Sequence, residues 1–316
     1  MAKTGLGVQG LLWCFTFVIL DAAQAVFFGG VLQQLDGFLI GGLVFGLSSI
    51  GCVVWTWWRS PQQIAIVRQH GAALLGMNLS AAGGWLAYFL AIQRIEPAVA
   101  FTLFSGIIPV TTIFAARLGY AEGQSWRNRM EAFGYGVLTL GMLLLSAFTL
   151  AGWSGFVRGG PDVALAGLGL AALSGILIAM MLLYSQCLDG HGLQPVAQFG
   201  LRFPLYLALT FVFYLLGIDD KGPVPLSDIV TAVAVGLIVL AFPIYAVQKA
   251  VSLTSSLTIG SVAAVAPLIV FLMQRLEGRV DYSNATSLGL SVYFLGAVIA
   301  ALGSARSVTR RPEAAG

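Results

Sequence analysis

Long apolar stretches, separated by short runs of glycine, proline and charged residues, dominate the pattern along the chain. A stretch of about 20 mostly apolar residues is long enough to cross the hydrocarbon core of a bilayer as an α-helix. Ten stretches meet this length, and we expect each to form a membrane-spanning helix. Their limits are 8–28, 37–58, 71–92, 97–118, 130–151, 163–187, 195–217, 228–249, 254–275 and 285–305.

Lys and Arg residues between these stretches predict the orientation, because positive charges concentrate in cytoplasmic loops. If the N-terminus lies inside, most of the basic residues also fall inside, among them Arg59, Arg127 and Arg129. Fewer fall outside, among them Arg94 and Arg158. We therefore expect a multi-pass protein of the inner membrane with both termini in the cytoplasm, and residues 306–316 as a polar cytoplasmic tail.

Composition favours the same class. Hydrophobic residues make up 58% of the chain and charged residues 9%, whereas a soluble domain carries about 25% charged residues. The net charge of +3 is scattered, with no basic stripe of interleaved aromatic residues, so we expect no nucleic-acid partner. The three cysteines and two histidines have no metal-ligand spacing. We expect no metal, no cofactor and no enzymatic activity.

Two copies of one pattern divide the chain. Ala91-Ile92-Gln93-Arg94, within "LAIQRIEP", corresponds to Ala246-Val247-Gln248-Lys249, within "YAVQKAVS". Further corresponding positions follow in the same order: Pro109 and Pro267, Glu122-Gly123 and Glu277-Gly278, Gly134 and Gly289, Gly141 and Gly296. We therefore expect two units of five spans, residues 1–151 and 152–305. An odd number of crossings turns the second unit over, which gives the inverted repeat typical of alternating-access transporters.

The fold class predicted in this way is an all-α polytopic membrane protein with ten transmembrane helices in two inverted five-helix repeats. The glycine pairs of the fifth and tenth spans, two turns apart, predict close helix packing. Packing within one chain is the favoured interpretation, and a homodimer interface is the alternative. An apolar run from Leu11 to Leu20 before Ala23-Gln24-Ala25 also fits a cleaved signal peptide, but it matches the first helix of the repeat.

A family resemblance follows from these stretches. "AIQRIEPAVAFTLFSGIIPV" with "RLGYAEG", and its second copy from "PIYAVQKAVS" to "QRLEG", resemble EamA-type domains of the drug/metabolite transporter superfamily. "LLWCF" and "QPVAQFGLRF" resemble the openings of the family's first and second helices, although Leu43 replaces in the first copy the arginine found as Arg202 in the second. Within the superfamily the chain is most similar to YddG-type exporters of aromatic amino acids. The resemblance implies a site between the halves.

Candidate binding residues are polar or aromatic side chains within the spans. Asn78, Trp85 and Tyr88 fall on one face of the third span, because seven to ten residues are two to three helical turns. This stripe fits a cavity wall, and Asn78 equally fits an interhelical hydrogen bond. The other candidates for the substrate site are Trp13, Phe101, Ser105, Tyr184 and Tyr245.

Two further roles are assigned from residue type. Asp21 is the carboxylate that lies well inside a predicted span, so it fits either proton coupling, contact with a substrate ammonium or a structural role. Pro109 and Pro267, at corresponding positions of the halves, fit hinges, because an interior proline removes a backbone hydrogen bond and kinks its helix.

The function expected from the sequence is export of amino acids, preferably aromatic or apolar, by alternating access. The partners are the small-molecule substrate and the lipid bilayer, with a monomer favoured over a homodimer. An exporter of lipophilic cations or other small metabolites is the first alternative. A membrane channel or scaffold is the second.

Overall fold

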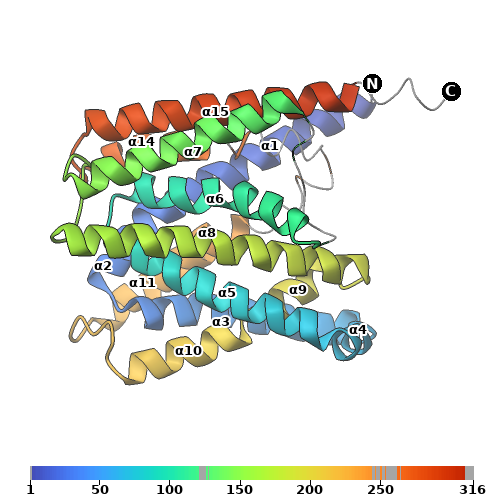
Figure 1. Cartoon of the computed structure of the whole chain (residues 1–316). Coiled ribbons are helices and arrows are strands. Elements are labelled where there is room, and N and C mark those ends of the chain that lie inside the picture. The colour runs from blue at the N-terminus through green and yellow to red at the C-terminus, as the bar shows by residue number, and fades with distance from the viewer. Residues whose placement is uncertain are drawn as a thin grey trace.

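The computed structural model describes residues 2–120, 126, 128–243, 246, 250, 253, 262–263 and 265–309, with side chains from Gln9 to Arg306. The named elements in this part of the chain are all helices, and the long ones run roughly parallel in one bundle, with the short α4 lying across one end (Figure 1). They are α1 (Ala2–Ala23), η1 (Gln24–Phe28), α2 (Gly29–Gln34), α3 (Gly37–Arg59), α4 (Gln63–Gln69), α5 (Gly71–Ile92), α6 (Pro97–Arg117), α7 (Arg129–Leu150), α8 (Pro161–Gly190), α9 (Pro195–Arg202), α10 (Pro204–Leu215), α11 (Leu226–Gly236), η2 (Leu237–Ala241), α14 (Ala266–Glu277) and α15 (Asn284–Thr309). The start of α1 and the end of α15 lie at the same end of the bundle.

Within the described residues, eight helical stretches are long and apolar enough to cross a membrane. They are Gln9–Gln34, Gly37–Arg59, Gly71–Ile92, Pro97–Arg117, Arg129–Leu150, Pro161–Gly190, Pro195–Leu215 and Asn284–Arg306. A shorter apolar helix, Leu226–Ala241, covers part of the expected span 228–249. Residues 244–245 and 247–249 of that span and much of 254–275 lie outside the described residues, and they include Tyr245, Gln248 and Lys249. These helices indicate a multi-pass membrane protein.

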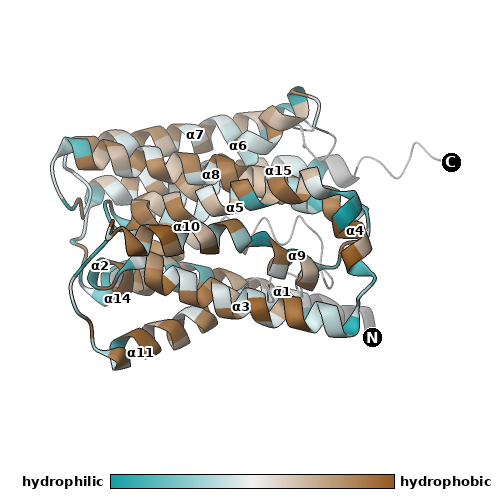
Figure 2. Cartoon of the chain, turned by 90° about the horizontal axis from the view of Figure 1, so that it is seen from below, coloured by the Kyte–Doolittle hydropathy of each residue, from teal (hydrophilic) through white to brown (hydrophobic). Residues whose placement is uncertain are grey.

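The lateral surface of the bundle suits lipid. Figure 2 shows hydrophobic residues along the lengths of the helices and hydrophilic ones mainly towards the two ends. Large apolar side chains such as Leu47 and Ile50 of α3 are more than half exposed. Where α3 ends, Trp57 and Trp58 are 70% and 75% exposed, and the Arg59 guanidinium lies 5.3 Å from the ring centroid of Trp58. Tryptophan and arginine at a helix end are typical of the interface between membrane and water.

Polar caps and prolines set the helix starts. Asp36 precedes α3, and its Oδ1 accepts hydrogen bonds from the backbone N–H groups of Phe38 and Leu39, both at 2.9 Å. Asn128 caps α7 in the same way through Glu131 N. Pro97, Pro161 and Pro195 stand in first turns, where a missing N–H breaks no helical bond.

The seventh span departs from the sequence expectation of one continuous helix over 195–217. Phe203 separates α9 from α10, and Pro204 begins the second segment. A proline at this position cannot donate the hydrogen bond that would continue the first helix, so the span is broken. Pro267 also differs from the expectation of an interior kink, because it lies in the first turn of α14, whereas Pro109 lies inside α6.

Glycines bring α7 and α15 into close backbone contact. A Cβ atom on Gly134 would overlap Ala300 N and stand 2.6 Å from Ala300 Cα, and one on Gly141 would stand 2.5 Å from Tyr293 N. A Cβ on Gly296 would meet the backbone of Leu138. Only glycine leaves room for this approach. The prediction that these glycines pack within one chain is confirmed for this helix pair.

A buried carboxylate ties the start of α6 to the C-terminal half. Glu96 is fully buried, and its Oε2 accepts hydrogen bonds from Gly155 N at 2.8 Å and Thr286 Oγ1 at 2.7 Å. Its Oε1 accepts a hydrogen bond from Gln274 Nε2. The Oε1 atom of Gln274 in turn accepts a hydrogen bond from Ala98 N at 3.0 Å. Burial raises the pKa of the Glu96 carboxyl, although these three donors act in the opposite direction.

Replacement of this carboxylate tests how much the network stabilises the bundle. We expect Glu96→Gln to lower stability by about 2 kcal/mol or more, because the new NH2 group faces a donor that then has no acceptor. The measurement is the thermal unfolding midpoint of the purified protein in detergent. Asp189→Asn, a change at an exposed position in the last turn of α8, where a carboxylate gains nothing from the helix dipole, is the control and should not lower the midpoint. Equal midpoints for both variants would contradict a stabilising role.

Candidate functional site

The first membrane-crossing stretch changes from an α-helix to a π-helix in the bundle interior. This segment, η1, carries Gln24, Ala25, Val26 and Phe28, which are all buried. Arg279 Nη2 donates a hydrogen bond to Val26 O at 3.2 Å. A second π-helix, η2, packs against η1. Short π-helical segments inside α-helices are frequent at functional sites, so the meeting of η1 and η2 marks a candidate.

Three buried donor groups lie on η1 and the facing part of α5. Gln24 Nε2, Trp85 Nε1 and Tyr88 Oη have no hydrogen-bond partner among the described residues. The side chains of Gln24 and Tyr88 are close enough to interact, but they form no hydrogen bond of good geometry. A buried polar group without a partner costs about 1–3 kcal/mol, so several in one place indicate a site built for something other than stability.

Asp21 adds a carboxylate to this group. It lies in the last turn of α1, is partly exposed and makes no hydrogen bond or ion pair among the described residues. Its carboxyl lies within electrostatic range of the Tyr88 hydroxyl. We use the term donor cluster for Gln24, Trp85 and Tyr88, with Asp21 beside them.

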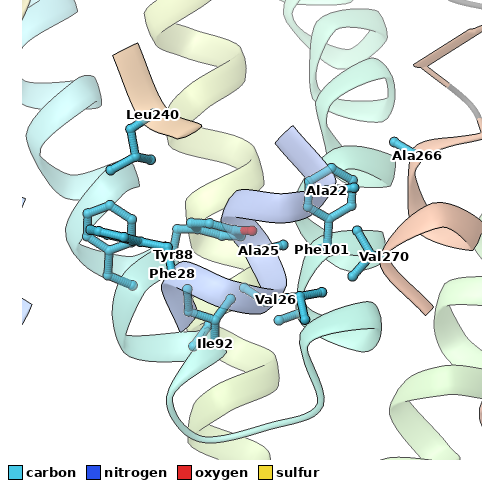
Figure 3. Packing of buried hydrophobic residues seen from close by; sticks show 14 of the residues in the cluster. Ala22, Ala25, Val26, Phe28, Tyr88, Ile92, Phe101, Leu240, Ala266 and Val270 are labelled. Carbon is cyan, nitrogen blue, oxygen red and sulfur yellow. The ribbon is translucent and has the colours of Figure 1, made fainter. Parts of the chain in front are cut away.

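Aromatic rings surround the donor cluster. The ring of Trp85 lies 5.1 Å from that of Phe45 and 6.1 Å from that of Tyr88, between centroids. Tyr88 in turn lies 4.8 Å from Phe104, which packs on Phe101 at 5.9 Å. Figure 3 shows Tyr88 beside Phe28, with its hydroxyl directed towards Ala25 of η1 and with Leu240 of η2 nearby. The cluster therefore combines π surface with unpaired donors.

The structure brings together some of the predicted site residues. Trp85, Tyr88 and Phe101 share one core, and Ser105 lies next to it, donating to Phe101 O at 2.8 Å. Trp13 packs against Phe242 with centroids 6.3 Å apart. Tyr184 lies elsewhere, against Gly76 and beside Tyr120. Tyr245 is outside the described residues.

Asn78 makes the interhelical hydrogen bonds that were the alternative to a cavity role. Its Nδ2 donates to Leu201 O at 2.8 Å, and its Oδ1 accepts from Leu205 N at 3.4 Å. These two groups stand on either side of the break between α9 and α10. Asn78 therefore satisfies two backbone groups that the break between α9 and α10 leaves without helical partners.

We expect Asn78→Ala to lower the thermal midpoint by several degrees, because Leu201 O and Leu205 N then lose a buried partner. Ser80→Ala is the control, since Ser80 is buried on the same helix and has no hydrogen bond to another span among the described residues. Unfolding followed by intrinsic fluorescence measures both variants. A midpoint for Asn78→Ala equal to that of Ser80→Ala would remove Asn78 from the support of the break.

Sequence reasoning missed Gln24 as a site residue and the aromatic wall of Phe28, Phe45 and Phe89. Gln24 carried a signal, since an amide inside an apolar span needs a partner or a function. The phenylalanines carried none, because a ring that faces lipid and a ring that faces a site look alike in sequence. Glu96 also carried a signal, as the carboxylate of "LAIQRIEP".

Neither the family models nor the curated proteins give a match to this chain. A crystal structure, described only as that of a protein, superposes with a TM-score of 0.64. The alignment covers 97% of this chain and 99% of the other, at 18% sequence identity. At this identity the likeness shows that the two chains share a fold.

Proposed function

We propose that the chain is an inner-membrane transporter that exports amino acids, preferably aromatic or apolar ones, by alternating access. The donor cluster is the observation that carries this proposal. A zwitterionic amino acid presents a carboxylate, which needs donors, and an ammonium, which needs an acceptor or a carboxylate. Gln24, Trp85 and Tyr88 offer the donors, and Asp21 offers the carboxylate. The surrounding rings suit an aromatic or apolar side chain.

The contacts between helices support an architecture of two inverted five-helix repeats of the EamA type, as in the drug/metabolite transporter superfamily. In such a repeat α1 corresponds to α8, α5 to η2 and α6 to α14. The contact of α5 with α8 should then have a counterpart between η2 and α1, and the contact of α6 with α8 a counterpart between α14 and α1. Both members of each pair of contacts are present. The contacting helices α7 and α15 correspond to each other, and so do α3 and α10, so each of these two contacts is its own counterpart. In Figure 1, α1 and α8 run in opposite directions, as such a repeat requires.

The position of the cluster supports alternating access as the mechanism. Gln24 lies on η1 of the first half, next to η2 of the second half, so relative movement of the halves would change access to it. We place both termini in the cytoplasm, which puts the end of the bundle with Glu96 on the outer side. Asp21 would contact the substrate ammonium or carry a coupling proton. Pro109, inside α6, remains a hinge candidate, whereas Pro267 stands in the first turn of α14 and has no interior kink to supply.

Transport into proteoliposomes tests the proposal. Labelled phenylalanine, tryptophan, lysine and a lipophilic cation are compared in parallel, with protein-free liposomes as background. We expect flux of the two aromatic amino acids above background. Phenethylamine, which lacks the carboxylate, should compete weakly because it leaves the three donors unpaired.

Equal background flux for all four compounds would refute the exporter. Flux of the lipophilic cation alone would favour the first alternative. Such a cargo has no carboxylate to accept hydrogen bonds from the donor cluster, so its transport would show that the cluster does not select the cargo. Flux that rises linearly with concentration without saturating would indicate a channel, and a protein that carries nothing would fit a scaffold.

A further inference from the structure

A polar pocket lies at the end of the bundle where α5 ends and α8 begins. It has a volume of about 320 Å³ and is lined by Gln93, Arg94, Arg158, Val163 and Asp219. It is separate from the donor cluster, and none of its lining residues belongs to that cluster. Two of its five lining residues are arginines, so the lining carries positive charge that a bound anion could neutralise.

The two arginines are placed opposite one another by the backbone. Ile95 and Val157 form an isolated antiparallel bridge, and Arg158 N donates a hydrogen bond to Arg94 O at 2.9 Å. Residues directly opposite in an antiparallel pair have their side chains on the same side, where like charges repel. The fold therefore places Arg94 and Arg158 opposite each other in the backbone, and both residues line the pocket.

The charges of these two arginines have no ion-pair partner in the described part of the chain. Neither Arg94 nor Arg158 forms an ion pair, and the one hydrogen bond from the Arg94 side chain goes to Leu90 O at 2.6 Å. Asp162, four residues after Arg158, pairs with neither arginine. The exposed Arg158 side chain makes no hydrogen bond within the described residues. Both guanidinium groups keep donors free for a ligand.

Asp219, the carboxylate of the lining, is occupied by other groups. Its Oδ2 accepts from Gly37 N at 2.8 Å and pairs with Lys221 Nζ at 2.5 Å. Lys221 also donates to Leu32 O, Leu35 O and Gln93 Oε1 at 2.9–3.3 Å. This network fixes the inner wall and balances Asp219 internally, so the pocket retains the charge of both arginines.

Val163, in the first turn of α8, lines the pocket. That turn adds little positive potential, because Pro161 has no N–H, Val163 N donates to Gly160 O at 3.0 Å and Asp162 is acidic. The pocket also lies at the ends of membrane-crossing helices, the depth at which lipid phosphates are found.

We propose that this pocket binds one phosphate group between the guanidinium groups of Arg94 and Arg158. A phosphate offers several oxygens to two planar donor groups, which bind it with directed, charge-assisted hydrogen bonds. Its charge also relieves the repulsion across the bridge. The group comes from a lipid head group or from free phosphate, and the site does not depend on which substrate the protein carries.

Thermal titrations of the purified protein in detergent test the site. One arm adds inorganic phosphate against chloride at matched ionic strength. The other adds phosphatidylglycerol against neutral diacylglycerol. We expect the midpoint of the wild type to rise with at least one phosphate source. In Arg94→Gln/Arg158→Gln the apparent affinity should fall about tenfold or more, because two charge-assisted interactions are lost. A rise with inorganic phosphate identifies a free-ion site, and a rise with the lipid alone identifies a head-group site.

Arg68→Gln/Arg129→Gln removes two exposed arginines at the opposite end of the bundle and is the matched control. It should keep the affinity of the wild type. Arg158→Gln alone changes an exposed side chain without hydrogen bonds in the described structure, so it should fold normally and lose part of the affinity. The proposal is overturned if the wild type responds to neither source, if the Arg94/Arg158 double variant responds as strongly as the wild type, or if the control loses as much.

Discussion

Gly134→Ala is expected to lower the thermal unfolding midpoint by several degrees, through an overpacking penalty of about 1–3 kcal/mol. The new methyl group would overlap the backbone of Ala300 on α15, and a helix backbone moves aside less readily than the end of a flexible side chain. The two helices would have to separate along their contact. Unfolding of the purified protein in detergent, followed by intrinsic fluorescence, measures the change.

Gly136→Ala is the matched control for this variant. Gly136 lies two residues further along α7, on another face of the helix, and a Cβ atom there meets nothing within 4 Å. Alanine forms helices better than glycine, so this change should leave the free energy of unfolding unchanged or raise it by up to about 1 kcal/mol. The midpoint should then stay the same or rise. If both variants lowered the midpoint equally, close contact with α15 would not be the cause.

Tyr88→Phe is expected to reduce transport of labelled phenylalanine about tenfold while leaving the midpoint unchanged or higher. The hydroxyl of Tyr88 is buried without a hydrogen-bond partner, so its removal relieves a desolvation cost in the folded protein. In the proposed function the same hydroxyl donates to the substrate carboxylate, a bond to a charged group that the variant cannot form. Opposite effects on stability and flux are typical of a binding residue.

Tyr206→Phe provides the comparison, because Tyr206 is also a buried tyrosine whose hydroxyl lacks a partner in the described structure. It lies on α10, close to Gly41 of α3, and is not part of the donor cluster. Its variant should gain stability in the same way and keep the flux of the wild type. Wild-type flux in Tyr88→Phe, or an equal loss in both variants, would place the substrate elsewhere.

The apolar stretches predicted most helix limits to within a few residues, because lipid requires long uninterrupted apolar segments whatever their neighbours are. The third span, expected at 71–92, is Gly71–Ile92, and the second, expected at 37–58, is Gly37–Arg59. The first continues to Gln34, beyond the expected end at residue 28. The extra residues form α2, and the change to the π-helix η1 that precedes it has no signal in the apolar pattern.

Side-chain roles were less predictable than helix limits. Asn78, Trp85 and Tyr88 share a face of α5, as their spacing requires, yet Asn78 bonds to the broken helix while the other two keep free donors. Spacing on one helix says nothing about which groups another helix brings to it. Arg94 and Arg158 likewise lie far apart in sequence, and a single antiparallel bridge makes them neighbours.

The sequence by itself determined that this protein is a bundle of membrane-crossing helices, and that its glycines at positions 134, 141, 289 and 296 serve packing. Both follow from local rules, since hydrocarbon selects apolar length and a missing side chain permits close approach. Only the tertiary structure decided which polar groups lack partners and which positively charged residues line one pocket. Those properties depend on what a second, distant segment places opposite each residue, and no periodicity within one helix contains that information.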